Sequence, residues 1–310
     1  MRPARRTVLA ALGAGAGAVL TAAVPVSAAA PAAAPAPGGA VRRGRARGGV
    51  GRVLAGLERE HGARLGVWAW DTGSGRVVAH RADELFPMCS VFKTLASAAV
   101  LRDLDRDGAF LARRIRYTQA DVDRSGHSPW TKDHVADGLT VGELCRVAIT
   151  HSDNTAANLV LRELGGPTAV TRFARSLGDR VTRLDRWEPE LNSAEPDRVT
   201  DTTSPRAIGR TYARLVLGDG LGRGDRELLT GWLRANTTSS ARFRKGLPPE
   251  WVLGDKTGGG WYGTNNDVGI AWPPHRAPLV LAVLTTKPDR AAAADDALVA
   301  RTAEVLAGVL

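Results

Sequence analysis

Strand patterns lie at both ends of the chain body, with helical patterns between them. Leu65–Asp71 and Arg76–His80 flank Thr72-Gly-Ser-Gly75, which predicts a β-hairpin. Beyond Gly246 three further strands are predicted, over Trp251–Lys256, Asn266–Trp272 and Pro278–Thr286. The simplest fold that joins these segments is one sheet built from both chain ends, with a helical domain inserted between them. We therefore expect an α/β part with an antiparallel sheet flanked by helices, plus an all-α part.

Helix signals fill the middle of the chain. A helical period begins near Pro87, Thr140-Val-Gly-Glu143 forms a capping box, and Ser204-Pro205 starts another helix. A final amphipathic helix follows the last strand. The expected boundaries are 50–83 and 235–310 for the α/β part and 84–234 for the helical part.

The N-terminus has the order of a secretory signal. Arg5-Arg6 precedes the uncharged apolar stretch Thr7–Val24, and Val26-Ser-Ala28 offers small residues for cleavage. We expect a signal peptide over 1–30, with the arginine pair favouring the twin-arginine route over the Sec route. An uncleaved membrane anchor is the alternative. Residues 31–49 are rich in Ala, Pro, Gly and Arg, which predicts a linker. The expected location is extracellular, without membrane attachment once the signal is removed.

Composition argues against several function classes. The net charge of the 310 residues is +10, but residues 1–49 hold seven arginines and no acid, which leaves 35 basic and 32 acidic residues in the body. A nucleic-acid-binding face is therefore not expected. The six histidines lack metal-ligand spacing, so no metal is expected. Gly258-Gly-Gly-Trp-Tyr-Gly263 matches a dinucleotide motif in letters, but it opens no helix, and no cofactor is expected.

Ser90-Val-Phe-Lys93 is the only SxxK sequence in the chain. Residues three apart share a helix face, so the lysine amine can approach the serine hydroxyl. A desolvated lysine can act as the base that a serine nucleophile needs. The apolar neighbours, among them Phe86 and Leu95, favour a buried setting. The motif predicts a nucleophilic serine.

Three more segments extend this chemistry along the chain. Ser152-Asp-Asn154 separates two helical segments, Glu188-Pro-Glu-Leu-Asn192 lies in a long polar loop, and Lys256-Thr-Gly258 ends a predicted strand. Each alone also fits an ordinary feature: a turn with a helix cap, a surface loop and a strand end. All four in this order are much harder to explain as coincidence.

These four motifs resemble the signatures of the class A serine β-lactamases, and the resemblance covers roughly residues 50–310. It implies the β-lactamase and penicillin-binding transpeptidase fold and hydrolysis of the β-lactam ring. The implied catalytic roles are nucleophile for Ser90, proton transfer for Lys93, proton relay to the leaving nitrogen for Ser152, and activation of the hydrolytic water for Glu188.

The resemblance also implies a substrate-binding set. Asn154 would bind the acylamide side chain, and Asn192 would help Glu188 to hold the water. Lys256 and Thr257, on a strand with Gly258, would meet the substrate carboxylate. The backbone N–H groups of Ser90 and Gly259 would form the oxyanion hole. Arg242, or Arg244 as the alternative, would also contact the substrate carboxylate. His127 matches the position at which the family has an aromatic gate residue.

Some positions depart from the family pattern. Cys145 matches a position that in some relatives pairs with a cysteine, but Ser97 stands at the partner position. Cys89 lies eight residues before Ser97, about 12 Å along a helix, so a Cys145 that faces Ser97 is too far from Cys89 for a disulfide. In carbapenem-hydrolysing relatives, the cysteine before the nucleophile forms a disulfide with a second cysteine. Gly260 stands at the position of that second cysteine here. We expect no disulfide.

Two functions fit the shared motifs. The first is a secreted hydrolase that opens penicillins and cephalosporins through a serine acyl-enzyme and gives β-lactam resistance. The second is a penicillin-binding peptidase or acylable receptor of the same fold, which would keep its acyl group. Glu188 and Asn192 favour the hydrolase, because Glu188 supplies the base for deacylation and Asn192 helps to hold the water. We expect a monomer whose partner is a small β-lactam substrate.

Overall fold

The computed structural model describes residues 38–310, with side chains from Gly49 onward. The predicted signal peptide, 1–30, lies outside the described residues. Helix α1 (Gly38–Glu60) begins inside the range 31–49 for which a linker was predicted. Alanine and arginine favour helix, so the composition that suggested a linker is also compatible with this extension of α1.

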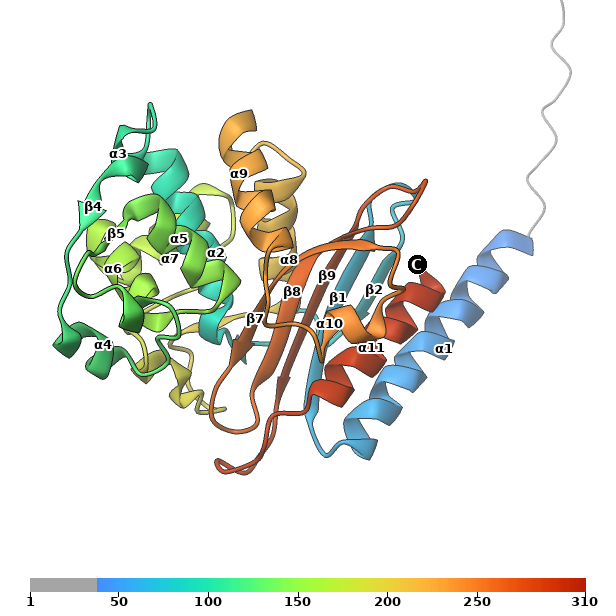
Figure 1. The fold of residues 1–310 in the computed structure, drawn as a ribbon. Helices are drawn as coiled ribbons and strands as arrows, with labels where there is room; N and C mark the ends of the chain where they lie inside the picture. Colours follow the sequence, from blue (N-terminus) through green and yellow to red (C-terminus); the bar gives the residue numbers. More distant parts are fainter. Residues whose placement is uncertain (1–37) are drawn as a thin grey trace, which may run out of the picture.

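Within the described residues, the main sheet has five antiparallel strands that come from both ends of the chain (Figure 1). In spatial order they are β2 (Val77–His80), β1 (Arg64–Asp71), β9 (Leu279–Thr286), β8 (Asn265–Trp272) and β7 (Val252–Gly259). Strand β1 pairs with β9 in a register that sets Trp68 opposite Ala282. The prediction of an antiparallel sheet built from both chain ends is confirmed.

Helices cover both faces of this sheet (Figure 1). The helices on one face are α1, α10 (Phe243–Gly246) and α11 (Asp296–Val309), and the helix on the other is α8 (Pro205–Val216). Leu54, Leu281 and Leu306 share the apolar cluster of the first face, while Ile208 and Val280 belong to the cluster of the second. Because both faces are covered, every residue of β9 is buried, as its near-continuous apolar sequence predicted.

Gly209 allows α8 to approach the sheet closely. A Cβ atom at this position would lie 2.4 Å from the Trp68 ring and 3.5 Å from the Ala282 Cβ. A larger residue would therefore push the helix away from the face that it covers.

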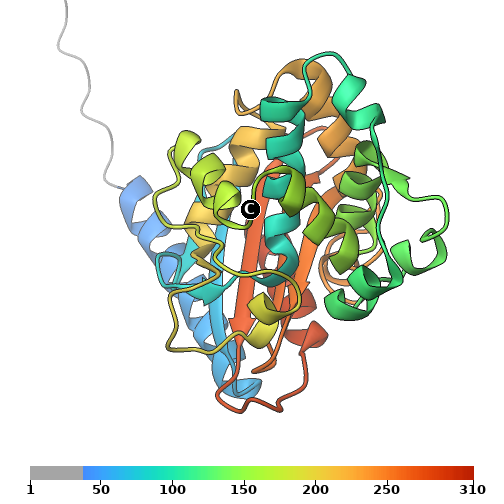
Figure 2. The same cartoon turned by 90° about the vertical axis from the view of Figure 1, so that its left-hand side faces the viewer.

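The inserted part is built around a buried helix, α2 (Phe92–Ala99), all of whose residues are buried. Figure 2 shows this teal helix in front of the sheet strands, with other helices on either side. The other helices of this part are α3 (Ala109–Ala112), α4 (Gln119–Ser125), α5 (Val141–Thr150), α6 (Asn154–Glu163), α7 (Thr168–Ser176) and α9 (Arg223–Arg234). Short elements complete it: β3 (Phe86–Pro87), η1 (Cys89–Val91), η2 (Val100–Leu104), β4 (Arg114–Ile115), η3 (Thr131–Asp133), β5 (Leu139–Thr140), η4 (Glu190–Ser193) and β6 (Thr202–Thr203).

Predicted capping residues begin two of these helices. Thr140 and Glu143 form the reciprocal capping box of α5, with the Thr140 N–H donating to Glu143 Oε2 at 2.7 Å. The Ser204 hydroxyl accepts from the Ala207 N–H at 3.2 Å, and Pro205 occupies the first turn of α8. Both predicted starts are confirmed. In the described part of the chain, none of the helices is long and apolar enough to cross a membrane.

Candidate active site

The SxxK motif lies at the start of the buried central helix. Ser90 is in the 3₁₀ turn η1, and Lys93 follows in the first turn of α2. The exposed fractions of the two residues are 6% and 0%. Cys89, just before them, has a φ of +48°, a left-handed conformation that is uncommon for a residue with a side chain. The chain therefore turns sharply into the helix and brings the hydroxyl and the amine to one face.

Lys93 contacts two of the other three motifs. Its Nζ lies 3.0 Å from Glu188 Oε1, and it donates hydrogen bonds to Asn154 Oδ1 at 2.6 Å and to the Ser152 carbonyl at 2.7 Å. Burial lowers the pKa of Lys93 below its usual value, and the Glu188 carboxylate opposes this shift. A lysine of this kind holds its proton less firmly, as a base for a serine requires.

Glu188 stands between the serine and the lysine. The Ser90 hydroxyl donates to Glu188 Oε1 at 3.2 Å, and the Asn192 side-chain amide donates to Glu188 Oε2. The side chain of Glu188 is fully buried. A buried carboxylate beside a hydroxyl and an amine can accept a proton from a water held in the same place.

Asn158 on helix α6 fixes the backbone of Glu188. The Glu188 N–H donates to Asn158 Oδ1 at 3.0 Å, and Asn158 Nδ2 donates to the Glu188 carbonyl at 2.9 Å. Sequence reasoning gave Asn158 no role. Its position one helical turn after Asn154 was the available signal, since residues four apart share a helix face.

An ion pair closes the loop that carries Glu188. Arg186 Nε lies 2.6 Å from Asp201 Oδ2, and the Asp201 carboxylate also accepts the backbone N–H groups of Asp185 and Arg186. Asp201 is 1% exposed. Burial and the two backbone hydrogen bonds therefore hold this ion pair more firmly than a solvent-exposed arginine–aspartate pair would be held.

Ser152-Asp-Asn154 forms the connection between α5 and α6. Asp153 caps α6 by accepting the Ala156 N–H at 2.8 Å, so the ordinary reading of this motif as a helix cap is also correct. Asn154 lies at the start of α6, where its side-chain amide donates to the Ser125 carbonyl at 2.9 Å while its Oδ1 accepts from Lys93. Ser152 itself has a φ of +56°, which turns the chain before the helix begins.

Lys256 reaches from the sheet to this connection. Its Nζ donates to Ser152 Oγ at 3.0 Å and to the Thr257 carbonyl at 2.8 Å, and the residue is fully buried. Burial lowers the pKa of Lys256 well below the usual lysine value, and the positive charge of Lys93 lowers it further. The Thr257 hydroxyl is hydrogen-bonded to the Thr238 hydroxyl. The end of β7 therefore presents an ammonium group and a hydroxyl beside Ser152.

Close packing holds β7 against the serine turn. A Cβ at Gly258 would lie 2.9 Å from the Met88 carbonyl oxygen, so only glycine fits there without a shift. A Cβ at Gly259 would have room, with its nearest neighbour 3.7 Å away. At Gly260 it would lie 2.6 Å from the Asn192 carbonyl oxygen and 2.9 Å from Cys89 Sγ.

The structure distinguishes the two candidate arginines. Arg242 Nη1 donates to the Gly258 carbonyl at 3.1 Å, and Arg242 Nε pairs with Asp296 at 2.7 Å. Arg244 instead donates to the carbonyls of Arg234, Asn236 and Leu253, and its nearest contact to the Lys256 motif is an ion pair at 3.6 Å with Asp255. Arg242 is therefore the arginine that the fold brings to the motif.

His127 lies next to Asn154. Its carbonyl accepts the Asn154 N–H at 2.8 Å, and its Nε2 lies 3.3 Å from the His151 carbonyl. The imidazole is exposed. The fold thus places His127, at the position expected for an aromatic gate residue, beside Asn154, which was expected to bind the acylamide side chain of the substrate.

Cys89 and Cys145 are both free and buried in the structure. Cys145 faces Ser97, whose hydroxyl donates to the Cys145 carbonyl at 3.4 Å. This arrangement agrees with the geometric argument made from the sequence. Among the described residues, no cluster of three or more His, Cys, Asp or Glu side chains could hold a metal ion.

Comparisons with known proteins give a consistent result. A sequence model described as the beta-lactamase enzyme family matches residues 50–308. The chain is 67% identical to a beta-lactamase of Streptomyces albus G, over all of this chain and 98% of that protein. It is 62% identical to a beta-lactamase of Streptomyces lavendulae, with the same coverage. The solved structure of the beta-lactamase from Streptomyces albus G superposes with a TM-score of 0.84 at 72% identity, covering 84% of this chain and 99% of that one.

Proposed function

The chain belongs to the class A serine branch of the beta-lactamase enzyme family, and on that premise we propose that it hydrolyses its substrates through an ester on Ser90. Beta-lactam hydrolysis itself follows from the family. The observation that carries the proposed mechanism is the position of Glu188 Oε1, 3.2 Å from the Ser90 hydroxyl and 3.0 Å from the Lys93 amine.

Acylation uses the groups around Ser90. Its Oγ attacks the lactam carbonyl carbon while its proton passes to the basic pair Lys93 and Glu188. The N–H groups of Ser90 and Gly259 stabilise the oxyanion. Ser152, which hydrogen-bonds to Lys256, delivers a proton to the lactam nitrogen as the C–N bond breaks. Ser152 regains a proton from Lys93, whose Nζ lies 3.5 Å from Ser152 Oγ. The product of this step is an ester between Ser90 and the opened ring.

Deacylation uses Glu188. Its carboxylate takes a proton from a water that Asn192 orients, and the resulting hydroxide attacks the ester carbonyl. The ester C–O bond then breaks, and Ser90 Oγ takes the proton that Glu188 removed from the water, which restores the serine hydroxyl. This step separates the hydrolase from a penicillin-binding peptidase or receptor, whose acyl group would stay. A carboxylate within hydrogen-bond distance of the nucleophile supports the hydrolase.

The remaining groups bind the substrate. Lys256 and Thr257, on the strand that continues through Gly258, meet the substrate carboxylate, and Arg242 supports them from the neighbouring helix. Asn154 binds the acylamide group, and His127 forms the wall beside it.

We further propose that the enzyme is exported as a monomer and that residues 50–310 form its catalytic domain. The 1–30 signal sequence, with its arginine pair, supports the twin-arginine route. Secretion would bring the hydrolase to β-lactams outside the cell and so give resistance.

The proposal is tested by following the ester on the protein. The parent is mixed with a penicillin, quenched in acid within milliseconds and weighed intact. A transient adduct with the full mass of the drug, absent from Ser90→Ala, supports the proposed ester. An adduct that persists in the Ser90→Ala variant would assign the nucleophile to another residue.

A further inference from the structure

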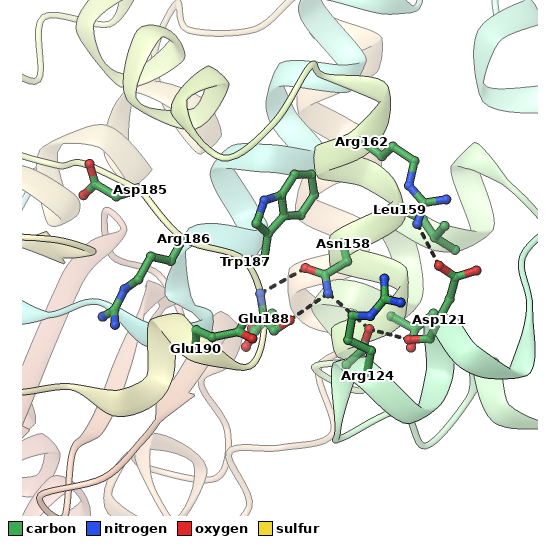
Figure 3. A pocket seen from close by; sticks show the side chains of 12 residues that line it. Asp121, Arg124, Asn158, Leu159, Arg162, Asp185, Arg186, Trp187, Glu188 and Glu190 are labelled. Atoms are coloured by element: carbon green, nitrogen blue, oxygen red, sulfur yellow. Dashed lines mark hydrogen bonds and ion pairs between the residues drawn. The ribbon is translucent and has the colours of Figure 1, made fainter.

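A cavity lies beside the loop that carries Glu188. Its volume is about 460 Å³, and it is bounded by α4, α6 and the loop from Asp185 to Glu190 (Figure 3). Ser90, Ser152 and Lys256 do not line it. The volume lies within the range of about 300–1,000 Å³ that small-molecule sites have.

The hydrogen-bonded pair of Asn158 and Glu188 lines the cavity, with Asn158 joined to the Glu188 backbone (Figure 3). The Glu188 carboxylate contacts Ser90, Lys93 and Asn192 instead. A molecule in the cavity would therefore touch the segment that positions the carboxylate without occupying the place of a β-lactam.

The cavity has an apolar wall. Leu159 is 1% exposed on α6, and Trp187, directly before Glu188, leaves 40% of its surface accessible. Both residues line the cavity. An indole and an aliphatic side chain in the lining of one cavity favour a flat aromatic body, which gains apolar burial mainly against the accessible indole.

Most charged side chains around the cavity are already paired. Arg162 lies 2.9 Å from Asp121, Asp185 lies 2.6 Å from Arg183, and Arg186 lies 2.6 Å from Asp201. Among the side chains of residues 49–310, no ion-pair or side-chain hydrogen-bond partner is found for Arg124 or for Glu190, two exposed residues that also line the cavity.

These two unpaired charges have opposite signs and come from different walls. Arg124 belongs to α4, and Glu190 begins η4 in the loop. In Figure 3 they lie on either side of the Asn158–Glu188 pair. A ligand that satisfies both needs an anionic group at one end and a cationic group at the other.

We propose that this cavity is a second ligand site for a small aromatic zwitterion. The carboxylate of the ligand binds Arg124, its ammonium group binds Glu190, and its ring packs on Leu159 and Trp187. Occupancy shifts the loop that carries Glu188 and slows deacylation. This kinetic consequence rests on the proposed role of Glu188, whereas the binding does not.

The binding is tested with 4-(aminomethyl)benzoate, a rigid ring with one charge at each end. Isothermal titration should give a Kd that rises roughly three- to tenfold in Arg124→Gln and in Glu190→Gln, because each variant removes one charge contact. Arg172→Gln, an exposed arginine of α7, is the matched control and should keep the parent Kd. 4-Methylbenzoate and benzylamine, which each lack one charge, should bind more weakly. Absence of binding to the parent, or equal Kd values in parent and both cavity variants, would overturn the proposal.

The coupling is tested by steady-state kinetics with a chromogenic cephalosporin. The probe should lower kcat and leave kcat/KM for acylation nearly unchanged, and Arg124→Gln should need more probe for the same effect. Competitive inhibition would mean that the probe binds in the catalytic cleft, which contradicts the proposed site. Binding without any change in kcat would refute the coupling. If the parent forms no ester on Ser90, the proposed function fails, while the titration still decides the binding site.

Discussion

The Lys256 ammonium group on strand β7 lies 3.0 Å from the hydroxyl of Ser152, at the junction between helices α5 and α6. The two residues are 104 positions apart in the sequence, and one comes from the sheet while the other comes from the inserted helical part. A cation and a hydroxyl that meet across this junction form one wall of the proposed substrate site. The contact therefore connects the assembly of the fold to substrate binding.

Lys256→Ala should weaken the reaction of substrates that carry a carboxylate. The variant removes a charge-assisted hydrogen bond, so we expect kcat/KM to fall by a factor corresponding to about 1.5–3 kcal/mol. Stopped-flow acylation rates with a penicillin measure the loss, and Lys245→Ala, a lysine of the short helix α10, is the control. If both variants keep the parent kcat/KM, Lys256 does not bind the carboxylate.

As the pH rises, kcat/KM should begin to fall at a lower pH than the titration of an ordinary lysine would give. Burial lowers the pKa of Lys256 well below 10.5, so rising pH removes its charge earlier than usual. The charge that binds the substrate carboxylate is then lost, and kcat/KM falls. Lys256→Arg keeps a charge at these pH values, so its fall in kcat/KM should move to higher pH even if its maximum rate is lower. If kcat/KM falls at the same pH in the parent and in Lys256→Arg, a group other than Lys256 causes the loss of activity.

Gly260→Ser should destabilise the protein and disturb Asn192. A side chain at this position would meet the Asn192 carbonyl oxygen at 2.6 Å, which is too close to be accommodated without a backbone shift. Overpacking of this kind costs about 1–3 kcal/mol, which should appear as a lower Tm in calorimetry. Gly259→Ala is the matched control for stability, because its Cβ has its nearest neighbour at 3.7 Å. Equal Tm values for the two variants would mean that the loop around Asn192 adjusts freely.

Both cysteine thiols should be unreactive until the protein unfolds. Burial raises the pKa of Cys145 to about 12 and also raises the pKa of Cys89, so little thiolate forms near neutral pH. Iodoacetamide should therefore add two groups in denaturant and none under native conditions, as measured by intact mass. A native mass lower by two hydrogens, restored by a reductant, would instead reveal a disulfide.

Local sequence signals were sufficient for much of the fold. Thr140 with Glu143 and Ser204 with Pro205 predict helix starts because each cap is made within one helical turn. The apolar run of β9 predicts a strand covered on both faces, and α8 and α11 cover it. These features depend on neighbours in sequence, and so they can be derived without knowing the tertiary structure.

The site was less accessible to such reasoning. The spacing of Ser90 and Lys93 predicts their proximity, but the contact between Lys256 and Ser152 depends on long-range packing and was expected only from a family resemblance. Asn158 was given no role, because its place one helical turn after Asn154 predicts a shared helix face but not the backbone that it binds. The choice between Arg242 and Arg244 required the structure, since the two residues lie two positions apart and direct their hydrogen bonds to different parts of β7.

The central claim is that Glu188 activates the water that releases the acyl group, and it is tested most directly by the fate of the ester in Glu188→Ala. Asn192 can orient a water but cannot take its proton, so the variant has no equally placed base for deacylation. Intact-mass spectrometry after mixing with a penicillin should show the full mass of the drug retained on the variant for far longer than on the parent, and no adduct on Ser90→Ala. An adduct on Glu188→Ala that disappears at the parent rate would contradict the mechanism, as would an equally long-lived adduct on the unmodified enzyme.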